Sequence, residues 1–148
     1  MLLGGPAMGG TALGGPALGG TAKENGAVSI TITNLRSDKG VVRACMTRDP
    51  KRFPDCREGD VTYRRVVKAG ETVEFRFDRV TPGRYAIALL HDENNNGKAD
   101  TALLMMPTEG YGFSRDAKVR LGPPKFRDAA FDVLPAEQKQ TIAMRYML

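Results

Sequence analysis

Oxygen-bearing side chains recur at every second position of one short segment, Asp92-x-Asn94-x-Asn96-Gly97-x-x-Asp100. Ca²⁺ takes six to eight oxygen ligands, and alternate positions of a tight loop direct their side chains toward one point. The first three named residues take the first, third and fifth places of such a loop. Gly97 takes the sixth place, where the backbone must turn sharply. The spacing therefore predicts a calcium-type loop.

The second half of the loop departs from the usual pattern. Lys98 would supply a main-chain carbonyl oxygen and Asp100 the ninth-place ligand, but Leu103 stands at the twelfth place, where a helix–loop–helix site has a bidentate Glu. No helical pattern flanks the loop, so that fold is excluded. We expect one more carboxylate from Glu109 or Glu93, and weak Ca²⁺ affinity, roughly 10⁻⁴–10⁻³ M. The alternative is a hairpin whose Asn and Asp side chains cap their own backbone.

Two cysteines, Cys45 and Cys56, are the other residues that could react. The chain has no Cys-x-x-Cys pair and one histidine, which leaves too few soft ligands for a zinc site. A disulfide would close a short loop and stabilise the fold by roughly 2.5–3 kcal/mol. The alternative is two free buried thiols, and because disulfides persist only in oxidising compartments, the choice depends on location.

The N-terminal segment bears on that location. Residues 1–22 carry no charge, hold 8 of the 17 glycines and contain a ten-residue repeat. Small residues precede Lys23, as they do at a signal-peptidase site, although no basic residue leads the segment. We expect residues 1–22 to be a signal peptide or a Gly-rich low-complexity segment and residues 23–148 to form one β-sandwich domain. A signal peptide would favour the disulfide and a periplasmic or secreted location.

Enzyme signatures are missing from the sequence. It has no Gly-x-Ser-x-Gly, no P-loop and no His-Glu-x-x-His, and its single histidine, His91, rules out most triads. We therefore expect a non-catalytic protein. One alternative is a small hydrolase-like enzyme that uses His91 and nearby carboxylates as acid and base. Another is a carbohydrate-binding module that uses Tyr111 and Phe113 as exposed aromatic side chains.

Charge argues against a nucleic-acid partner. Lys and Arg outnumber Asp and Glu by 22 to 17, which gives a net charge of +5. The basic residues are dispersed, and the densest pairs, Arg64–Arg65 and Lys51–Arg52, have acidic neighbours, so they indicate a solvated surface. Weak attraction to anionic envelope lipid is the alternative. No apolar run approaches the ~18 residues of a membrane helix, so we expect a soluble protein.

The elements that position these residues are short strands. Apolar and polar residues alternate over residues 28–33, 42–46 and 73–78, and residues 85–90 are nearly all apolar, as in a central strand. Residues 109–114 are expected to be irregular, and residues 126–133 to form a strand or one helical turn. Seven or eight strands separated by regular turn signals predict an all-β sandwich. The predicted core is Val28, Ile30, Ile32, Val42, Ala44, Val73, Phe75, Phe77, Tyr85, Ile87, Leu89, Ile142 and Met144.

Three segments carry specific motifs: Thr81-Pro-Gly-Arg-Tyr through Asp100, Met106-Pro-Thr-Glu-Gly-Tyr-Gly-Phe-Ser114, and Gly122-Pro-Pro-Lys-Phe through Phe131. Together they resemble a bacterial family of small exported proteins known as domain of unknown function 2141. The resemblance implies an immunoglobulin-like or transthyretin-like sandwich, an envelope or secreted location and no particular reaction. It also places Glu109 where it could close back on the Asn-rich loop. We expect a monomer that contacts no nucleic acid, with cell-envelope or glycan contact as the candidate partnership.

Overall fold

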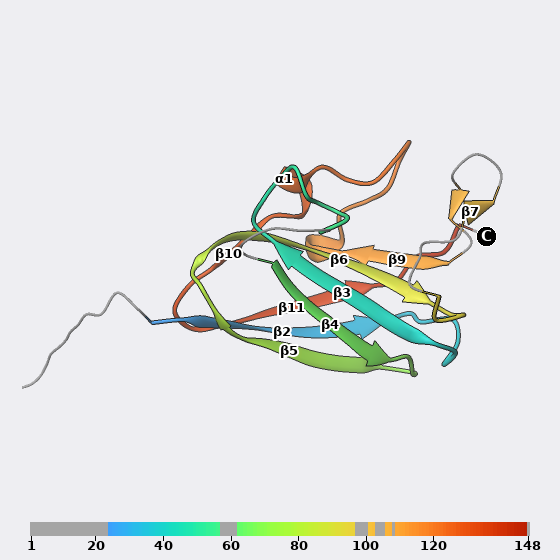
Figure 1. Ribbon diagram of the computed structural model, residues 1–148, viewed down its shortest axis with the longest axis horizontal. Coiled ribbons are helices and arrows are strands. Elements are labelled where there is room, and N and C mark those ends of the chain that lie inside the picture. Colours follow the sequence, from blue (N-terminus) through green and yellow to red (C-terminus); the bar gives the residue numbers. More distant parts are fainter. Residues whose placement is uncertain (1–23, 57–61, 97–100, 103–105, 108, 148) are drawn as a thin grey trace, which may run out of the picture.

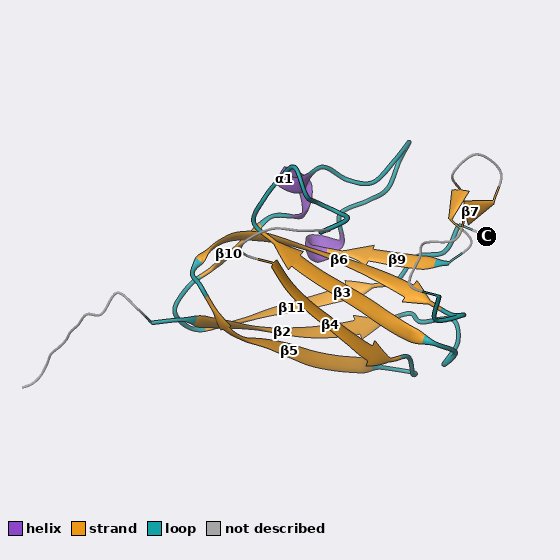
Figure 2. Cartoon of the chain, viewed as in Figure 1, coloured by secondary structure: helices purple, strands orange, loops and turns teal. Residues whose placement is uncertain are grey.

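The body of the protein is a sandwich of two β-sheets (Figure 1). The computed structural model describes residues 24–56, 62–96, 101–102, 106–107 and 109–147. In these residues the helical turns η2 (Ser114–Asp116) and α1 (Phe126–Ala129) are short, and none is long and apolar enough to span a membrane. Figure 2 shows both turns outside the sheets. The two sheets contain five and three strands, which confirms the predicted all-β sandwich.

The larger sheet is centred on its longest strand, β6. Its strands are β3 (Val41–Thr47), β4 (Thr62–Lys68), β6 (Gly83–Asp92), β9 (Gly110–Phe113) and β10 (Phe131–Val133). β3 runs along one side of β6, whereas β10 and β9 share the other side. Ile87 falls between these two short strands, and its N–H donates to the Ser114 hydroxyl at 2.9 Å. Ser114 in turn donates to the carbonyl of Ala129, so one hydroxyl satisfies the Ile87 N–H at this break and links it to the segment before β10.

The smaller sheet has β2 at its centre. Its strands are β2 (Gly26–Thr33), β5 (Val73–Val80) and β11 (Glu137–Ala143), with β11 parallel and β5 antiparallel to β2. Backbone hydrogen bonds of 3.0 and 2.8 Å between Tyr111 and Arg145 join the two sheets along one side. Along the other side, the Arg65 guanidinium donates to the carbonyl of Arg76 at 2.7 Å. A separate two-stranded ladder pairs β7 (Thr101–Ala102) with β8 (Met106–Pro107).

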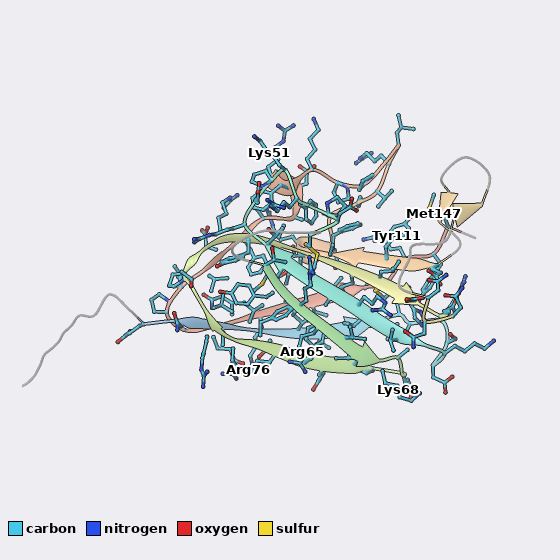
Figure 3. The ribbon with its side chains drawn as sticks, in the orientation of Figure 1. Lys51, Arg65, Lys68, Arg76, Tyr111 and Met147 are labelled. Atoms are coloured by element: carbon cyan, nitrogen blue, oxygen red, sulfur yellow. A yellow bond between two sulfur atoms is a disulfide. The ribbon has the colours of Figure 1, made fainter. Side chains whose placement is uncertain are left out.

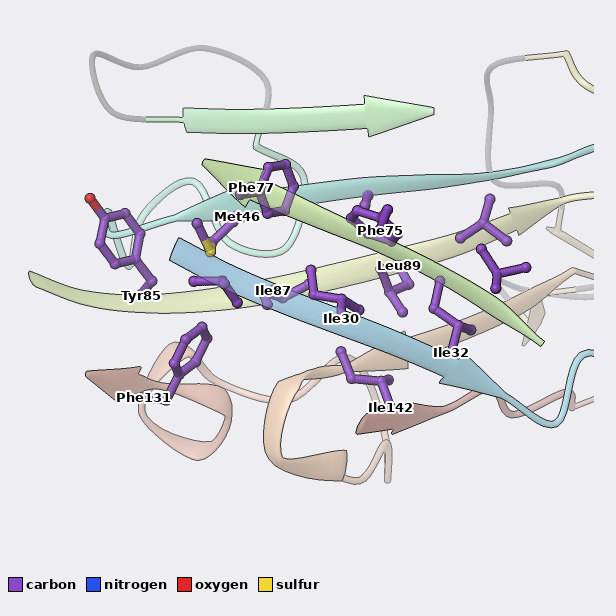
Figure 4. Close-up of a cluster of buried hydrophobic side chains, with 14 of the residues drawn as sticks. Ile30, Ile32, Met46, Phe75, Phe77, Tyr85, Ile87, Leu89, Phe131 and Ile142 are labelled. Atoms are coloured by element: carbon purple, nitrogen blue, oxygen red, sulfur yellow. The ribbon is translucent and has the colours of Figure 1, made fainter. Parts of the chain in front are cut away.

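The core lies between the sheets, where the alternating apolar residues face one another (Figure 4). Every residue of the predicted core is buried there. Met46, Ala69, Val80, Phe131 and Val133 complete it. Strand alternation was enough to identify these positions because each strand has one face on the core and one face toward the outside.

The outer face of the larger sheet carries a second apolar cluster. Phe53, from the loop after β3, packs edge-on against Phe113 and Phe126 at ring separations of 5.8 and 6.1 Å. Cys45 and Cys56 form a disulfide that ties this loop to β3, with their Cα atoms 6.1 Å apart. The predicted disulfide is confirmed, and the alternative of two free thiols is wrong.

The structure also corrects the expectation that residues 109–114 are irregular, because Gly110–Phe113 is strand β9. Glycine is uncommon in strands, but here the two glycines face inward, where there is no space for a side chain. A Cβ on Gly110 would lie 2.2 Å from the ring of Tyr146, and one on Gly112 would lie 2.8 Å from Ile142. Residues 126–133 form both the predicted helical turn, α1, and a strand, β10.

Candidate functional site

The predicted calcium-type loop begins where β6 ends. Asp92 is the last residue of β6, and its side chain is completely buried. It faces the outer side of the sheet beside Arg43 of β3, whose Nε donates to its Oδ2 at 2.7 Å. Arg43 also donates from its Nη2 to Oδ1 of Asn95 at 2.8 Å. One guanidinium therefore ties the end of β6 to the first turn of the loop.

The start of the loop curls around one backbone N–H group. The amide of Asn96 donates to Oδ1 of Asp92 at 3.1 Å and to Oδ1 of Asn94 at 3.3 Å. Asn95 adopts a left-handed conformation, φ 53°, which Asn tolerates better than most residues. The side-chain oxygens of Asp92 and Asn94 thus converge on the same point. In the hairpin alternative, Asn and Asp side chains cap their own backbone in this way. The same arrangement also brings together two of the oxygens that a calcium ion would use.

Glu109 lies beside this loop start, as the resemblance implied. His91 and Gly110 are paired in the antiparallel β6–β9 register. The next residue of β6, Asp92, therefore lies beside Glu109, the residue before β9. Glu109 is only 4% exposed, although it is a carboxylate. Two buried carboxylates therefore occupy neighbouring positions at this end of the sheet. Such burial of charge is costly unless each group has polar partners or ligands.

Glu93, the alternative source of a carboxylate, is already engaged. Its carboxylate accepts from Arg36 at 2.7 and 3.3 Å and from the Ser37 hydroxyl at 2.7 Å. The hydrogen bonds from Arg36 hold the pKa of Glu93 at about 2, well below its usual value. The Arg36 guanidinium also lies 4.6 Å above the ring of Tyr146. Glu93 therefore fixes the segment after β2 to the end of β6.

His91 faces the interior and is completely buried. Its Nε2 lies 2.9 Å from the carbonyl oxygen of Lys39, which can only accept, so Nε2 carries a proton. Its Nδ1 lies 2.8 Å from the hydroxyl of Tyr146, which also accepts from the backbone N–H of Arg36 at 3.1 Å. Both ring nitrogens are occupied and the ring has no exposed surface, so in this arrangement His91 cannot reach a substrate proton.

Four of the six predicted metal ligands lie in the described part of the chain. Asp92, Asn94, Asn96 and Glu109 gather at one end of β6, whereas Lys98 and Asp100 lie outside the described residues. Within the residues that the structure does describe, no group of three His, Cys, Asp or Glu side chains is placed to hold a metal ion. The oxygens present are of the hard type that Ca²⁺ prefers, but the Arg43 guanidinium beside Asp92 competes with a cation.

The two aromatic residues proposed for carbohydrate binding are not exposed. Tyr111 is 8% and Phe113 6% exposed, and both belong to the second apolar cluster under the loop of Phe53. Figure 3 labels Tyr111 against β9. Burial raises the pKa of Tyr111, and its hydroxyl makes no hydrogen bond within the described part of the chain. The expectation of an exposed aromatic platform is wrong, and a glycan contact would need other side chains.

Sequence reasoning missed the partners that hold this site. Arg43 and Asp92 are 49 positions apart, and His91 and Tyr146 are 55 apart. No local pattern connects such residues. Only the register of β3 on β6, which sets Val41 opposite Asp92, brings Arg43 within reach.

A surface groove lies at the opposite end of the sandwich, where β2 begins. Its lining includes Arg76, Asp78, Arg79 and Glu137. Arg76 pairs with Asp78 at 2.6 Å and with Glu137 at 3.2 Å, and Glu137 also accepts from Ser29. Because these charges largely compensate one another, the groove offers no unbalanced charge to a ligand.

Fold and site together define a small disulfide-bonded β-sandwich with a loop of clustered oxygens at one sheet end. Comparison with family models places the chain more narrowly. Residues 30–143 match the family described as "Uncharacterized protein conserved in bacteria (DUF2141)". The chain belongs to this family, which confirms the resemblance seen in the sequence. Neither a curated protein nor a solved structure matched the chain.

Proposed function

We propose that this chain is an exported, non-catalytic β-sandwich module that works in the bacterial cell envelope or outside the cell. The observation that carries the proposal is the disulfide between Cys45 and Cys56. Disulfides of this structural kind persist in the periplasm and outside the cell, and they are rare in the reducing cytosol. The uncharged N-terminal segment, with small residues before Lys23, is consistent with export.

Export can be tested by expressing the full chain with a C-terminal tag in a bacterial host. We expect the tagged protein in the periplasmic or culture fraction, with both cysteines protected from alkylation until a reductant is added. A matched chain that starts at Lys23 should stay in the cytosol with both thiols reactive. Finding the full chain in the cytosol, with both cysteines alkylated, would overturn the proposal.

The non-catalytic part of the proposal is supported by the contacts of His91. A general base needs a nitrogen within reach of a substrate proton, and both nitrogens of His91 are held by Lys39 and Tyr146. Buried polar residues fully engaged in this way usually stabilise a unique packing. Replacing His91 is therefore expected to lower stability rather than to remove a reaction.

As a second function, we propose weak Ca²⁺ binding by the Asn-rich loop, with Asp92, Asn94, Asn96, Lys98, Asp100 and Glu109 as ligands. The supporting observations are the convergence of the Asp92 and Asn94 oxygens on one N–H group and the buried position of Glu109 beside Asp92. A bound cation would interact favourably with the charge of these two carboxylates, in addition to the partners that they already have. Arg43 already compensates part of it, which is a further reason to expect weak affinity.

Calorimetric titration of the full chain with CaCl2 tests this second proposal. We expect saturable heat at a Kd of roughly 10⁻⁴–10⁻³ M. Glu109→Gln and Asp100→Asn should each weaken binding at least ten-fold, whereas Asp132→Asn, an exposed carboxylate on β10, should leave it unchanged. No heat at millimolar calcium, or equal heat in all variants, would remove the proposal.

A further inference from the structure

The segment between η2 and α1 projects away from both sheets (Figure 1). Its apex is a tight turn in which the N–H of Arg120 donates to the carbonyl of Gly122 at 3.3 Å. Leu121 stands at this apex with a relative exposure of 107%, the highest among the exposed large apolar side chains of the described residues. Single exposed leucines are ordinary on protein surfaces, so the surroundings of Leu121 decide whether it has a role.

The surroundings of Leu121 are strongly basic. Residues 118–127, which we call the basic tip, contain no acidic residue and four exposed cations, Lys118, Arg120, Lys125 and Arg127. The next acidic residue, Asp128, turns back to accept from the backbone N–H of Lys125 at 3.4 Å. No salt bridge of the described residues includes a cation of the basic tip. The tip therefore presents uncompensated positive charge around one apolar apex.

A neighbouring loop adds to this charge. Lys51 is exposed, and Figure 3 shows it at the same side of the molecule as α1. The ring contact between Phe53 and Phe126 holds the two loops together. Arg52, in contrast, is paired with Asp49 at 3.1 Å, so it adds little to the net positive charge beside the tip. Lys51, which is in no salt bridge of the described residues, thus adds one further cation beside the basic tip.

The base of the tip is anchored although its apex is exposed. Ala117 and Pro124 are buried on either side of the apex, and Val119 and Phe126 pack against the second apolar cluster. The tip is therefore a fixed protrusion of the sandwich. A fixed protrusion loses less conformational freedom on binding than a mobile loop would.

We propose that the basic tip docks on an anionic phospholipid membrane, with Leu121 entering the interface and the surrounding cations contacting lipid phosphates. A convex apex with one apolar residue and a ring of cations matches a surface that is negative outside and apolar beneath. A soluble polyanion would use the cations but would gain nothing from Leu121. The biological setting rests on the envelope location proposed above, whereas the physical interaction does not depend on it.

The magnitude follows from the number of cations. Each Lys or Arg near an anionic surface strengthens binding about five-fold at moderate salt, and salt weakens the effect because it screens exposed charges. Loss of two cations should therefore weaken binding at least 25-fold. Loss of the Leu121 side chain should weaken it about ten-fold with little dependence on salt, since its contribution is apolar.

Co-sedimentation of the full chain with vesicles of phosphatidylglycerol and phosphatidylcholine tests the proposal. We expect binding to mixed vesicles at low salt and none to pure phosphatidylcholine. Lys118→Glu with Arg120→Glu, and separately Leu121→Ser, should reduce binding by the factors given above. The matched controls are Lys68→Glu with Lys139→Glu, and Leu134→Ser, because these residues are also exposed but lie outside the basic tip.

A fluorescent reporter distinguishes insertion from simple charge attraction. The chain contains no Trp, so Leu121→Trp introduces one signal at the apex, and we expect a blue shift with mixed vesicles that Leu134→Trp does not show. Absence of binding to mixed vesicles, equal loss in the control variants, or binding without a blue shift would each overturn membrane docking. Dextran sulfate binding that is as tight as vesicle binding and insensitive to Leu121→Ser would also overturn it. A failed vesicle assay leaves the fractionation result intact, so the two proposals can fail separately.

Discussion

Replacing Arg43 should change stability and calcium affinity in opposite directions. Arg43 Nε lies 2.7 Å from Oδ2 of the buried Asp92, and a hydrogen bond between charged groups is worth about 1.5–3 kcal/mol. Because Arg43 is 34% exposed and water can partly replace it, we expect Arg43→Gln to lower the free energy of unfolding by about 2 kcal/mol without calcium. Urea denaturation in EDTA measures this loss.

The same substitution should tighten calcium binding. A calcium ion on Oδ2 of Asp92 would sit ~2.4 Å from that oxygen, hence no more than ~5 Å from the Arg43 Nε that donates to it. Repulsion between charges of +2 and +1 at that distance is about 1.7 kcal/mol in a water-like dielectric, or about fifteen-fold in Kd. Calorimetry with CaCl2 on Arg43→Gln should therefore give a Kd at least ten-fold lower than the wild type.

The matched control is Arg84→Gln, which removes an exposed Arg–Asp pair at the other end of β6. Arg84 lies 3.3 Å from Asp132, with side chains 55% and 66% exposed. Exposed pairs of this kind contribute little, so this variant should change stability by less than about 0.5 kcal/mol and leave the calorimetric heat unchanged. Calcium affinity that is unchanged or weaker in Arg43→Gln would refute the calcium reasoning, and unchanged stability would refute the account of the ion pair.

Three further predictions concern the parts that hold the site. Replacing both Cys45 and Cys56 by Ser should lower the free energy of unfolding by about 2.8 kcal/mol, the loop entropy for a separation of 11 residues. Urea denaturation measures this loss, and the reduced wild type, which should lose the same amount, is the control. Glu93→Gln should lower the free energy of unfolding by about 1 kcal/mol at pH 7, a value reduced for solvent screening of the ion pair. Because the folded pKa of Glu93 is about 2, this difference should vanish between about pH 5 and pH 2, and a constant difference would contradict it. Gly110→Ala should lower the free energy of unfolding by about 1–3 kcal/mol, because the added methyl group would clash with the ring of Tyr146. In a chain that already carries Tyr146→Ala, the same substitution should lower it much less.

Strand positions were predictable because burial on one face imposes a two-residue period. Residues 28–32 and 73–77 alternate so clearly that their faces were assigned correctly. Strand β11 was harder, because Glu137–Thr141 is polar and only its last residues face the core. Ile142 and Met144 were therefore predicted as core residues, but the polar start of the strand at Glu137 was not. Strand β9 was missed for the opposite reason: its inward positions are glycines, whose function is to leave space for residues from other elements.

The site was predictable only in part, because most of its proposed ligands are close together in sequence and the residues that hold them are not. The spacing from Asp92 to Asn96 is a property of the loop, and the structure does bring these oxygens together. Arg43 holds Asp92 and Tyr146 holds His91, and both come from segments distant in sequence. The basic tip was not predicted from the sequence for a related reason. Its four cations are spread over ten positions, and only the protruding turn places them around one apex.

Chemically reactive residue types at the end of β6 do not by themselves indicate an enzyme. The ring nitrogens of His91 contact Lys39 and Tyr146, and the carboxylate of Glu93 accepts from Arg36. All three partners lie in segments distant in sequence. These contacts fix both ends of the turn between β2 and β3 and so give the following loop a rigid base. In this chain the motif at the end of β6 can thus meet a structural requirement rather than serve a reaction. The two binding proposals made above concern other groups, which face outward: the oxygens after β6 and the cations of the basic tip.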